Sequence, residues 1–324
     1  MAQYTGIQGS NILIVSSDPA NPVEGQIWYN STSNLLKSYG FAPGSWATGG
    51  NLPATRGEMG GAGTQTAALA FGGLNSPPFT TYGDAYKYDG TSWTATGSMI
   101  NGRMQMASAG TQTAAFGAGG YAQPVGRTEK FDGTSWTSSG NLNTNRRVIS
   151  GTGTQTAGLA LGGFLYPPGA INAAESYNGS SWTNITSLPA ASNSGSAFGT
   201  QTAALYAAAS GPAFPNTSSI FWNGSSWTTG GSLNSGRSSA SSSGTDTAGI
   251  IFGGSPAGAA TELYNGTSFS NSGNLSTPRY QIGGARSAPN SAALGFGGYN
   301  GSAYLSATEE FTGATLATRT ITTS

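Results

Sequence analysis

Cysteine and histidine are both absent from the 324-residue sequence. Without cysteine the chain has no disulfide, no thiolate-bound zinc and no thiol nucleophile. Without histidine it lacks the side chain that proteins use most often as a general base and metal ligand. We therefore expect no metal and no other cofactor.

Charge is scarce as well. Only 7% of the residues are charged, and 12 basic residues balance 12 acidic ones. No basic stripe is present to neutralise a phosphate backbone, which argues against a nucleic-acid partner. No apolar run approaches the roughly 20 residues of a membrane-spanning helix. The first residues lack the basic start and apolar core of a signal peptide, so we expect neither membrane insertion nor a secretion signal.

The sequence instead contains a repeat. Gly-Thr-Gln-Thr-Ala at 63–67 is followed by an apolar stretch, Gly-Gly at 72–73, a variable loop and Tyr-Asp-Gly-Thr-Ser-Trp at 88–93. The first glycine returns at steps of 43 to 47 residues. A period of this length without a helical pattern predicts the blades of a β-propeller. The units begin at Gly63, Gly110, Gly153, Gly199 and Gly244, with a degraded copy at Ala288.

Turn signals divide each unit into four short strands. In the second unit we expect strands at about 104–109, 113–117 and 129–131, and a fourth from Trp136 onward. Asp132-Gly133 favours a tight hairpin turn, because both positions tolerate positive φ. No segment predicts a helix. The large side chain after this turn should pack between neighbouring blades; the series is Trp46, Trp93, Trp136, Trp182, Trp227, Phe269 and Leu316.

The repeat resembles the kelch repeat over residues 51–316. The resemblance lies in the apolar run, Gly-Gly, the aromatic-x-Asn/Asp-Gly turn and the Trp, and it implies an all-β propeller of four-stranded antiparallel blades. An arginine often opens a kelch repeat, and here an arginine precedes most of the repeat glycines by seven residues. Ser192 breaks this series, which consists of Arg56, Arg103, Arg146 and Arg237, with Arg279 nine residues before Ala288.

The first fifty residues leave two architectures open. Residues 23–50 predict a hairpin and place Trp46 in phase with the repeat, and 11–15 is a β-prone run. Either 11–50 forms a seventh blade, or 23–50 is a separate hairpin module beside six blades. We favour seven blades. Residues 1–22 are the candidate attachment arm, and 317–324 are the end of the last strand.

Residues 22–39 also resemble a motif of tailed-bacteriophage fibre and appendage proteins, and kelch-like chains with Gly-Thr-Gln-Thr-Ala units are similar to those of phages of marine bacteria. The resemblance implies a virion protein, made in the host cytoplasm and present in several copies or as a homo-oligomer. Other virion proteins would be its partners.

Recognition is expected on the face that carries the variable loops. The arginine series enters this face, and its members are candidate ligands for an acidic glycan or lipopolysaccharide phosphate. The favoured alternative is that they form exposed ion pairs worth about 0–1 kcal/mol each, with Glu129, Glu175, Glu262 and Glu309. Aromatic residues of the same loops are further candidate ligand contacts: Phe79, Tyr121, Tyr166 and Tyr299.

Catalysis is not expected. A glycosidase needs two facing carboxylates, whereas most acidic residues here recur in phase with the repeat. The out-of-phase exceptions are Glu58, Asp84, Asp246 and Glu310. The sequence thus favours a non-enzymatic virion protein, a tail-fibre or appendage component that binds host-surface glycan. A purely architectural virion protein and, less favoured, a glycan depolymerase are the alternatives.

Overall fold

The structure is a computed structural model that describes residues 12–121, 125–256 and 258–321. Within these ranges it is all-β and contains no helix, as predicted, and so no helix that could span a membrane. The chain forms two compact units, Met1–Gly44 with Gly313–Ser324 (unit 1) and Ser45–Thr312 (unit 2). Residues 1–11 of the expected attachment arm and 322–324 of the expected strand end lie outside the described residues.

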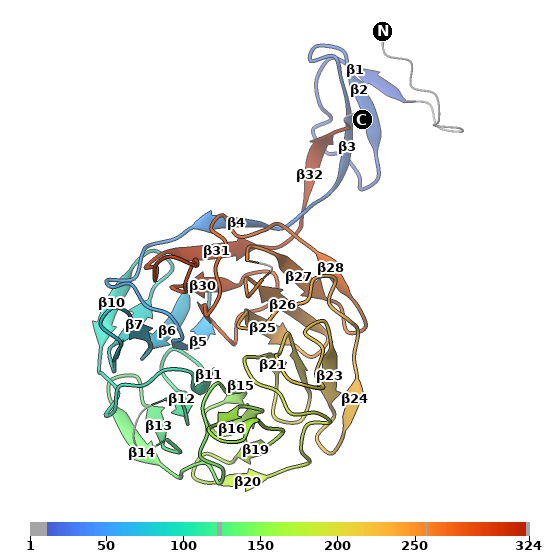
Figure 1. The fold of residues 1–324 in the computed structure, drawn as a ribbon. Coiled ribbons are helices and arrows are strands. Elements are labelled where there is room, and N and C mark those ends of the chain that lie inside the picture. Colours follow the sequence, from blue (N-terminus) through green and yellow to red (C-terminus); the bar gives the residue numbers. More distant parts are fainter. Residues whose placement is uncertain (1–11, 122–124, 257, 322–324) are drawn as a thin grey trace. The chain divides into compact units, whose positions relative to one another are not determined.

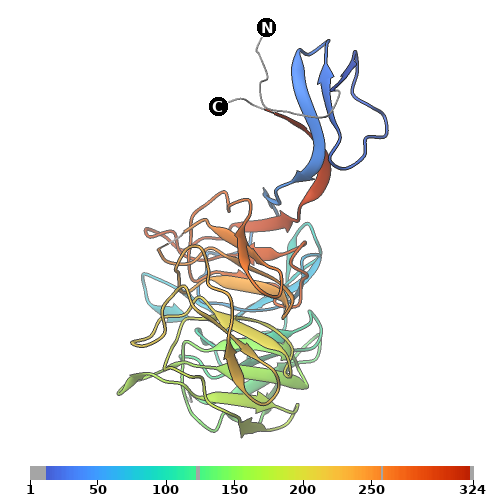
Figure 2. The same cartoon turned by 90° about the vertical axis from the view of Figure 1, so that its right-hand side faces the viewer.

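Unit 1 is a four-stranded sheet that joins both ends of the chain. The predicted hairpin forms from β2 (Ile27–Asn30) and β3 (Leu35–Ala42), and β1 (Leu13–Val15) pairs parallel to β2. The C-terminal β32 (Thr315–Thr320) pairs antiparallel to β3, and Figure 2 shows it in red beside the blue strands. The Asp18 carboxylate accepts hydrogen bonds from Lys37, Asn30 and Trp28, which lower its pKa to about 2.

Unit 2 contains six four-stranded antiparallel sheets, here named sheets 1 to 6. The first three are β5 (Gly60–Thr64), β6 (Ala67–Phe71), β9 (Ala85–Tyr88) and β10 (Trp93–Thr96); β11 (Ala107–Gly110), β12 (Ala115–Ala118), β13 (Thr128–Phe131) and β14 (Trp136–Ser139); and β15 (Ser150–Thr154), β16 (Ala157–Leu161), β19 (Ala174–Tyr177) and β20 (Trp182–Asn184).

Sheets 4 to 6 follow the same order, except that the outer strand of sheet 6 comes from the start of the unit. They are β21 (Ser196–Gly199), β22 (Ala204–Ala207), β23 (Ser219–Trp222) and β24 (Trp227–Thr229); β25 (Ser241–Thr245), β26 (Ala248–Phe252), β27 (Thr261–Tyr264) and β28 (Phe269–Asn271); and β29 (Gly283–Gly284), β30 (Leu294–Phe296), β31 (Thr308–Thr312) and β4 (Ser45–Thr48). Two-stranded ribbons extend the loops of sheets 1 and 3: β7 (Leu74–Asn75) with β8 (Thr80–Thr81), and β17 (Phe164–Leu165) with β18 (Gly169–Ala170).

The six sheets of unit 2 surround a common centre in a propeller-like arrangement (Figure 1). The first strands of successive sheets contact one another in cyclic order, and β29 of sheet 6 also contacts β5 of sheet 1. The all-β prediction with four-stranded antiparallel sheets is therefore confirmed.

The glutamine of the repeated Gly-Thr-Gln-Thr-Ala joins each of sheets 1 to 4 to its predecessor in the circular order. Gln112 Nε2 of sheet 2 donates to the carbonyls of Ala68 (3.2 Å) and Tyr88 (2.6 Å) in sheet 1. Gln65 makes the equivalent bonds from sheet 1 to Ala293 (3.0 Å) and Phe311 (2.8 Å) of sheet 6. Gln155 and Gln201 repeat the pattern. The repeated phrase is therefore a connector between sheets.

The tryptophans after the hairpin turn also pack between sheets, as predicted. The Trp136 ring lies 4.7 Å from the ring of Phe71 in sheet 1, and that of Trp93 lies 5.0 Å from that of Phe296 in sheet 6. The prediction is wrong for Leu316. That residue belongs to β32 of unit 1 and is 40% exposed, and Trp46 takes the outer-strand position of sheet 6 instead.

The expectation that residues 11–50 form a seventh blade is also wrong. β4 pairs with β31, with Trp46 opposite Phe311, whereas β1, β2 and β3 belong to the sheet of unit 1. The phase of Trp46 was correct, but it completes the sixth repeat and does not begin another. Residues 313–316, which the sequence placed in the last repeat, belong to unit 1.

Candidate functional site

The arginines of the repeat are buried inside the sheets that they open. Arg103 Nη2 lies 2.7 Å from Glu129 Oε1, Arg279 Nη2 lies 2.8 Å from Glu309 Oε1, and Arg56 pairs with Asp84 at 2.8 Å. The other pairs are Arg146–Glu175 and Arg237–Glu262. The five arginines are at most 4% exposed. The predicted ion pairs exist, but the expectation that they are exposed is wrong, and their burial leaves these guanidinium groups little surface for a ligand.

Each buried glutamate also holds the connection that enters its sheet. The Glu262 carboxylate accepts the backbone N–H groups of Asn234 (2.7 Å) and Ser235 (3.2 Å) as well as the guanidinium of Arg237. Glu129 does the same for Ile100 and Asn101. Burial lowers the pKa of Arg237, and its glutamate opposes that shift. The buried arginine–glutamate pairs therefore have a structural role, which recurs from sheet to sheet.

Sheet 4 lacks both partners of this pair. Ser192 stands at the arginine position and Ile220 at the glutamate position. Tyr206 of β22 fills the space, and its hydroxyl lies 3.0 Å from Ser192 Oγ. The arginine and the glutamate are thus replaced together.

Three of the four predicted loop aromatics lie at a surface that we call the aromatic groove, which buried Arg146 of the arginine series also lines. It has a volume of about 510 Å³, and its walls include Tyr121, Asn145, Arg147, Phe164 and Tyr166. Tyr166 is 90% exposed. Phe79, which is 60% exposed, extends the surface through an edge-to-face contact with Tyr121 at 5.9 Å. Residues 122–124, which follow Tyr121, lie outside the described part of the chain.

Arg147 is the cation of the groove, and the arginine series did not include it. Its guanidinium lies 5.0 Å from the ring centre of Tyr121 and 5.4 Å from that of Phe164. Within the described ranges it makes no ion pair. Cation–π contacts position the guanidinium through its flat face. They leave the N–H groups in the guanidinium plane able to donate hydrogen bonds. The sequence signal was its place directly after Arg146, outside the repeat phase.

Tyr299, the fourth predicted aromatic, belongs to another cluster. Its ring centre lies 5.5 Å from that of Tyr280 and 4.9 Å from that of Tyr304. Tyr299 also bridges both residues through its backbone. The structure therefore does not bring Tyr299 together with the aromatic groove.

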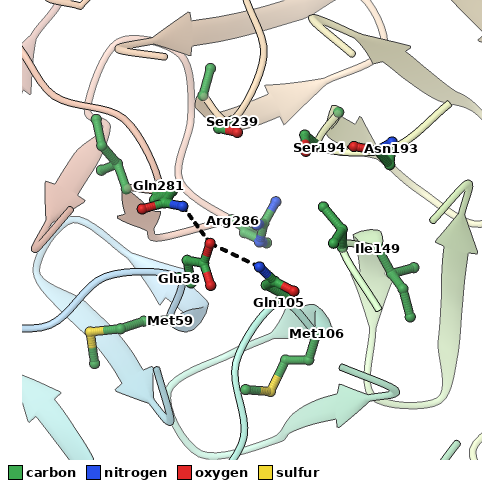
Figure 3. Close-up of a pocket in the computed structure, with 14 residues that line it drawn as sticks. Glu58, Met59, Gln105, Met106, Ile149, Asn193, Ser194, Ser239, Gln281 and Arg286 are labelled. Carbon is green, nitrogen blue, oxygen red and sulfur yellow. Dashed lines mark hydrogen bonds between the residues drawn. The ribbon is translucent and has the colours of Figure 1, made fainter. Parts of the chain in front are cut away.

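A second cavity lies at the centre of the sheets, and sequence reasoning missed it. We call it the axial cavity; its volume is about 230 Å³, and it is lined by residues from all six sheets or their entry segments. Figure 3 shows Glu58 between Gln105 and Gln281, whose side-chain amides both donate to Glu58 Oε1. Burial raises the pKa of Glu58.

A ring of left-handed residues surrounds this cavity. Each sheet contributes one non-glycine residue with φ between 55° and 60° at its entry segment, a conformation that is uncommon for such residues. Their backbones are linked in sequence, for example Gln105 N to Glu58 O (3.2 Å) and Glu58 N to Gln281 O (3.0 Å). The six are Glu58, Gln105, Val148, Ser194, Ser239 and Gln281.

The other out-of-phase acids have internal partners or neighbours. Asp84 pairs with Arg56, and Glu310 accepts a hydrogen bond of 2.6 Å from the Tyr88 hydroxyl. Asp246 replaces the connecting glutamine in sheet 5. Burial raises the pKa of Tyr264, and the charge of Asp246 adds to that shift. No group of three or more acidic residues that could hold a metal ion occurs in residues 12–121, 125–256 and 258–321.

Neither the comparison with protein-family models nor that with curated proteins finds a match for this sequence.

Proposed function

We propose that unit 2 is a six-bladed, kelch-like β-propeller that binds a glycan through the aromatic groove, as a non-enzymatic tail-fibre or appendage component of a bacteriophage virion. The observation that carries the glycan proposal is the exposure of Tyr166 and Phe79 beside Arg147. Aromatic rings offer rigid apolar faces with a polar edge, and a planar guanidinium offers several hydrogen-bond donors. A sugar, which has apolar ring faces and hydroxyl edges, matches both.

The distribution of exposed apolar residues supports the choice of this surface. Among the described residues, the large apolar side chains that are exposed in unit 2 are Phe79, Ile100, Tyr121 and Tyr166. Three of these four belong to the aromatic groove or its extension. Contiguous exposed apolar surface marks an interaction site more often than isolated residues do. The virion assignment rests on the resemblance of residues 22–39 and of the repeat to phage proteins.

Tyr166→Ala tests the glycan proposal. We expect the variant to bind host-envelope polysaccharide at least about tenfold more weakly than the natural chain, a loss of about 1.4 kcal/mol, because it removes the most exposed ring of the groove. Tyr166→Phe is the matched control, since it keeps the ring and should keep most of the affinity. Binding is measured on a glycan array and then by titration calorimetry with the best ligand.

Equal binding by the natural chain and by Tyr166→Ala would exclude the groove as the glycan site. Release of reducing ends from the polysaccharide by the natural chain would contradict the non-enzymatic part of the proposal and favour a depolymerase.

Unit 1 favours a second, architectural function. Five large apolar side chains on its described surface are at least 39% exposed, although the unit is much smaller than unit 2. β1 and β32 are also the two edge strands of its sheet, and edge strands are templates for pairing with another chain. We propose that unit 1 attaches the chain to another virion protein. The five residues are Leu13, Ile14, Val23, Leu35 and Leu316.

Ile14→Glu tests this attachment. The side chain is 71% exposed, so the variant protein should fold normally. The new carboxylate places a charge in the proposed interface. We expect fewer copies of the chain on purified particles, measured by quantitative mass spectrometry, and unchanged glycan binding. Ile100→Glu, at a 53% exposed position of unit 2, is the matched control and should leave the copy number unchanged. Equal copy numbers for both variants would argue against attachment through β1.

A further inference from the structure

The degraded sixth repeat directs an arginine into the axial cavity. The inner strand of sheet 6 is only Gly283–Gly284, and the chain then leaves the strand. Arg286 Nε donates to Ser108 Oγ of β11 in sheet 2 at 3.1 Å. Ser287 fixes the segment through bonds from its hydroxyl to Gly110 O (2.8 Å) and from its N–H to Gly63 O (2.9 Å).

Arg286 has no acidic partner among the residues that the structure describes. It forms none of the ion pairs found among the described residues, and its Nη1 is buried without a hydrogen bond. Burial lowers the pKa of this guanidinium to about 10, so it is still a cation at neutral pH. Every arginine of the repeat series, by contrast, has a carboxylate partner.

The same cavity contains two buried acceptors without a partner, Glu58 Oε2 and Gln105 Oε1. Their residues lie with Arg286 around the centre of the cavity in Figure 3. A buried polar atom that makes no hydrogen bond is costly, about 1–3 kcal/mol. One unpaired cationic donor and two unpaired acceptors therefore define what a complementary ligand must carry.

The donor set selects the class of ligand. A neutral sugar would give the buried Nη1 of Arg286 no anionic acceptor, and a simple anion such as acetate would leave Glu58 and Gln105 without donors. A phosphate dianion would bring two negative charges toward the carboxyl group of Glu58, where like charges repel. A carboxylate with neighbouring hydroxyl groups satisfies all three atoms.

We infer that the axial cavity binds a small hydroxylated carboxylate of the sugar-acid class, with its carboxylate on Arg286 and its hydroxyl groups donating to Glu58 and Gln105. This site is distinct from the proposed glycan site, because no described residue lines both the aromatic groove and the axial cavity. The two are electrostatically linked: burial raises the pKa of Glu58, and the charge of Arg147 opposes that shift.

The test is titration calorimetry of the full chain with D-glucuronate. We expect binding, and at least about tenfold weaker binding of glucose, acetate and inorganic phosphate. Arg286→Met, which keeps the length of the side chain but removes its donors, should weaken glucuronate binding by at least about tenfold, the effect of losing about 1.4 kcal/mol. Tyr166→Ala should leave glucuronate binding unchanged, which separates this site from the groove.

A change in the ligand keeps the test valid even if Arg286→Met fails to fold. Glucuronamide has the same hydroxyl groups but no charge, so the natural chain should bind it at least about tenfold more weakly than glucuronate. No binding of glucuronate at millimolar concentration, equal binding of glucuronamide or phosphate, or loss of binding in Tyr166→Ala would each overturn the inference.

Discussion

Glu262→Ile is expected to destabilise the protein by about 3–5 kcal/mol, the range for removal of one partner from a buried ion pair. The substitution leaves the guanidinium of Arg237 buried without its counter-ion. It also removes the acceptor for the N–H groups of Asn234 and Ser235. The free energy of unfolding, measured by urea denaturation, gives the size of the loss.

The protein itself provides the design of the control. Sheet 4 has Ser192 and Ile220 at these positions, with Tyr206 in the space between them. Tyr206 lies opposite Ile220 in the strand pairing, as Ile251 lies opposite Glu262. A Cβ at Gly195 would lie 2.5 Å from the Tyr206 ring, and sheet 5 has Ala240 at the corresponding position. A copy of sheet 4 in sheet 5 therefore combines Arg237→Ser, Ile251→Tyr and Glu262→Ile with Ala240→Gly. Replacing a buried pair by packed neutral side chains is often neutral or stabilising, so we expect this quadruple variant to recover most of the loss.

A quadruple variant that is as unstable as Glu262→Ile would show that the pair does more than neutralise its own charges. It would point to the carboxylate bonds with the entering backbone as the larger contribution. The ion pair and the backbone anchor would then have to be separated with Glu262→Gln, which keeps one acceptor oxygen.

The local structure of each repeat could be predicted from the sequence. Asp132-Gly133 forms the expected turn, in which the Asp132 carboxylate accepts the N–H groups of Thr134 and Ser135, and the strands on both sides lie within a few residues of the expected bounds. These features depend on short-range backbone preferences and on the period of the repeat. Both are visible in one sequence.

The partner of the outermost strand could not be predicted in this way. A circular array has the same phase at both of its ends, so Trp46 fits equally well as part of an added repeat or as the last strand of the sixth. Leu316 was also a candidate for that position, because it follows the Thr312-Gly313 turn at the same spacing as the tryptophans of the first four repeats follow their own turns. Only the pairing of β4 with β31 decides between them.

Neither candidate site was fully visible in the sequence, for different physical reasons. The loops of Phe79, Tyr121 and Tyr166 were expected on one face, but their lengths do not tell which side chains meet. The segments that enter the sheets do repeat a large apolar residue four positions before the arginine, as at Leu142 and Leu233, but this spacing alone does not tell that the arginine is buried. The axial cavity depends on left-handed backbone at residues such as Val148, a conformation that sequence preference argues against.

Trp46→Ala is expected to open sheet 6 at its outer strand. The Trp46 ring lies 4.8 Å from that of Phe252 and 5.2 Å from that of Phe311, and its Nε1 donates to Thr261 Oγ1 at 2.9 Å. The ring thus joins sheets 5 and 6. We expect a loss of about 3 kcal/mol, the lower end of the range for removal of a packed tryptophan, because the side chain of Trp46 is only partly buried.

The location of the damage distinguishes this variant from an ordinary core mutation. In sheet 6 the outer strand β4 is far in sequence from its neighbour β31, whereas β14 of sheet 2 follows β13 directly. Trp136→Ala, which removes the equivalent ring from sheet 2, is therefore the matched control. Hydrogen exchange should become faster across 45–48 and 308–312 in Trp46→Ala and stay slow there in Trp136→Ala. If residues 45–48 and 308–312 exchange at the same rate in both variants, the Trp46 ring does not hold β4 in place. That result would contradict the idea that β4 closes the proposed propeller.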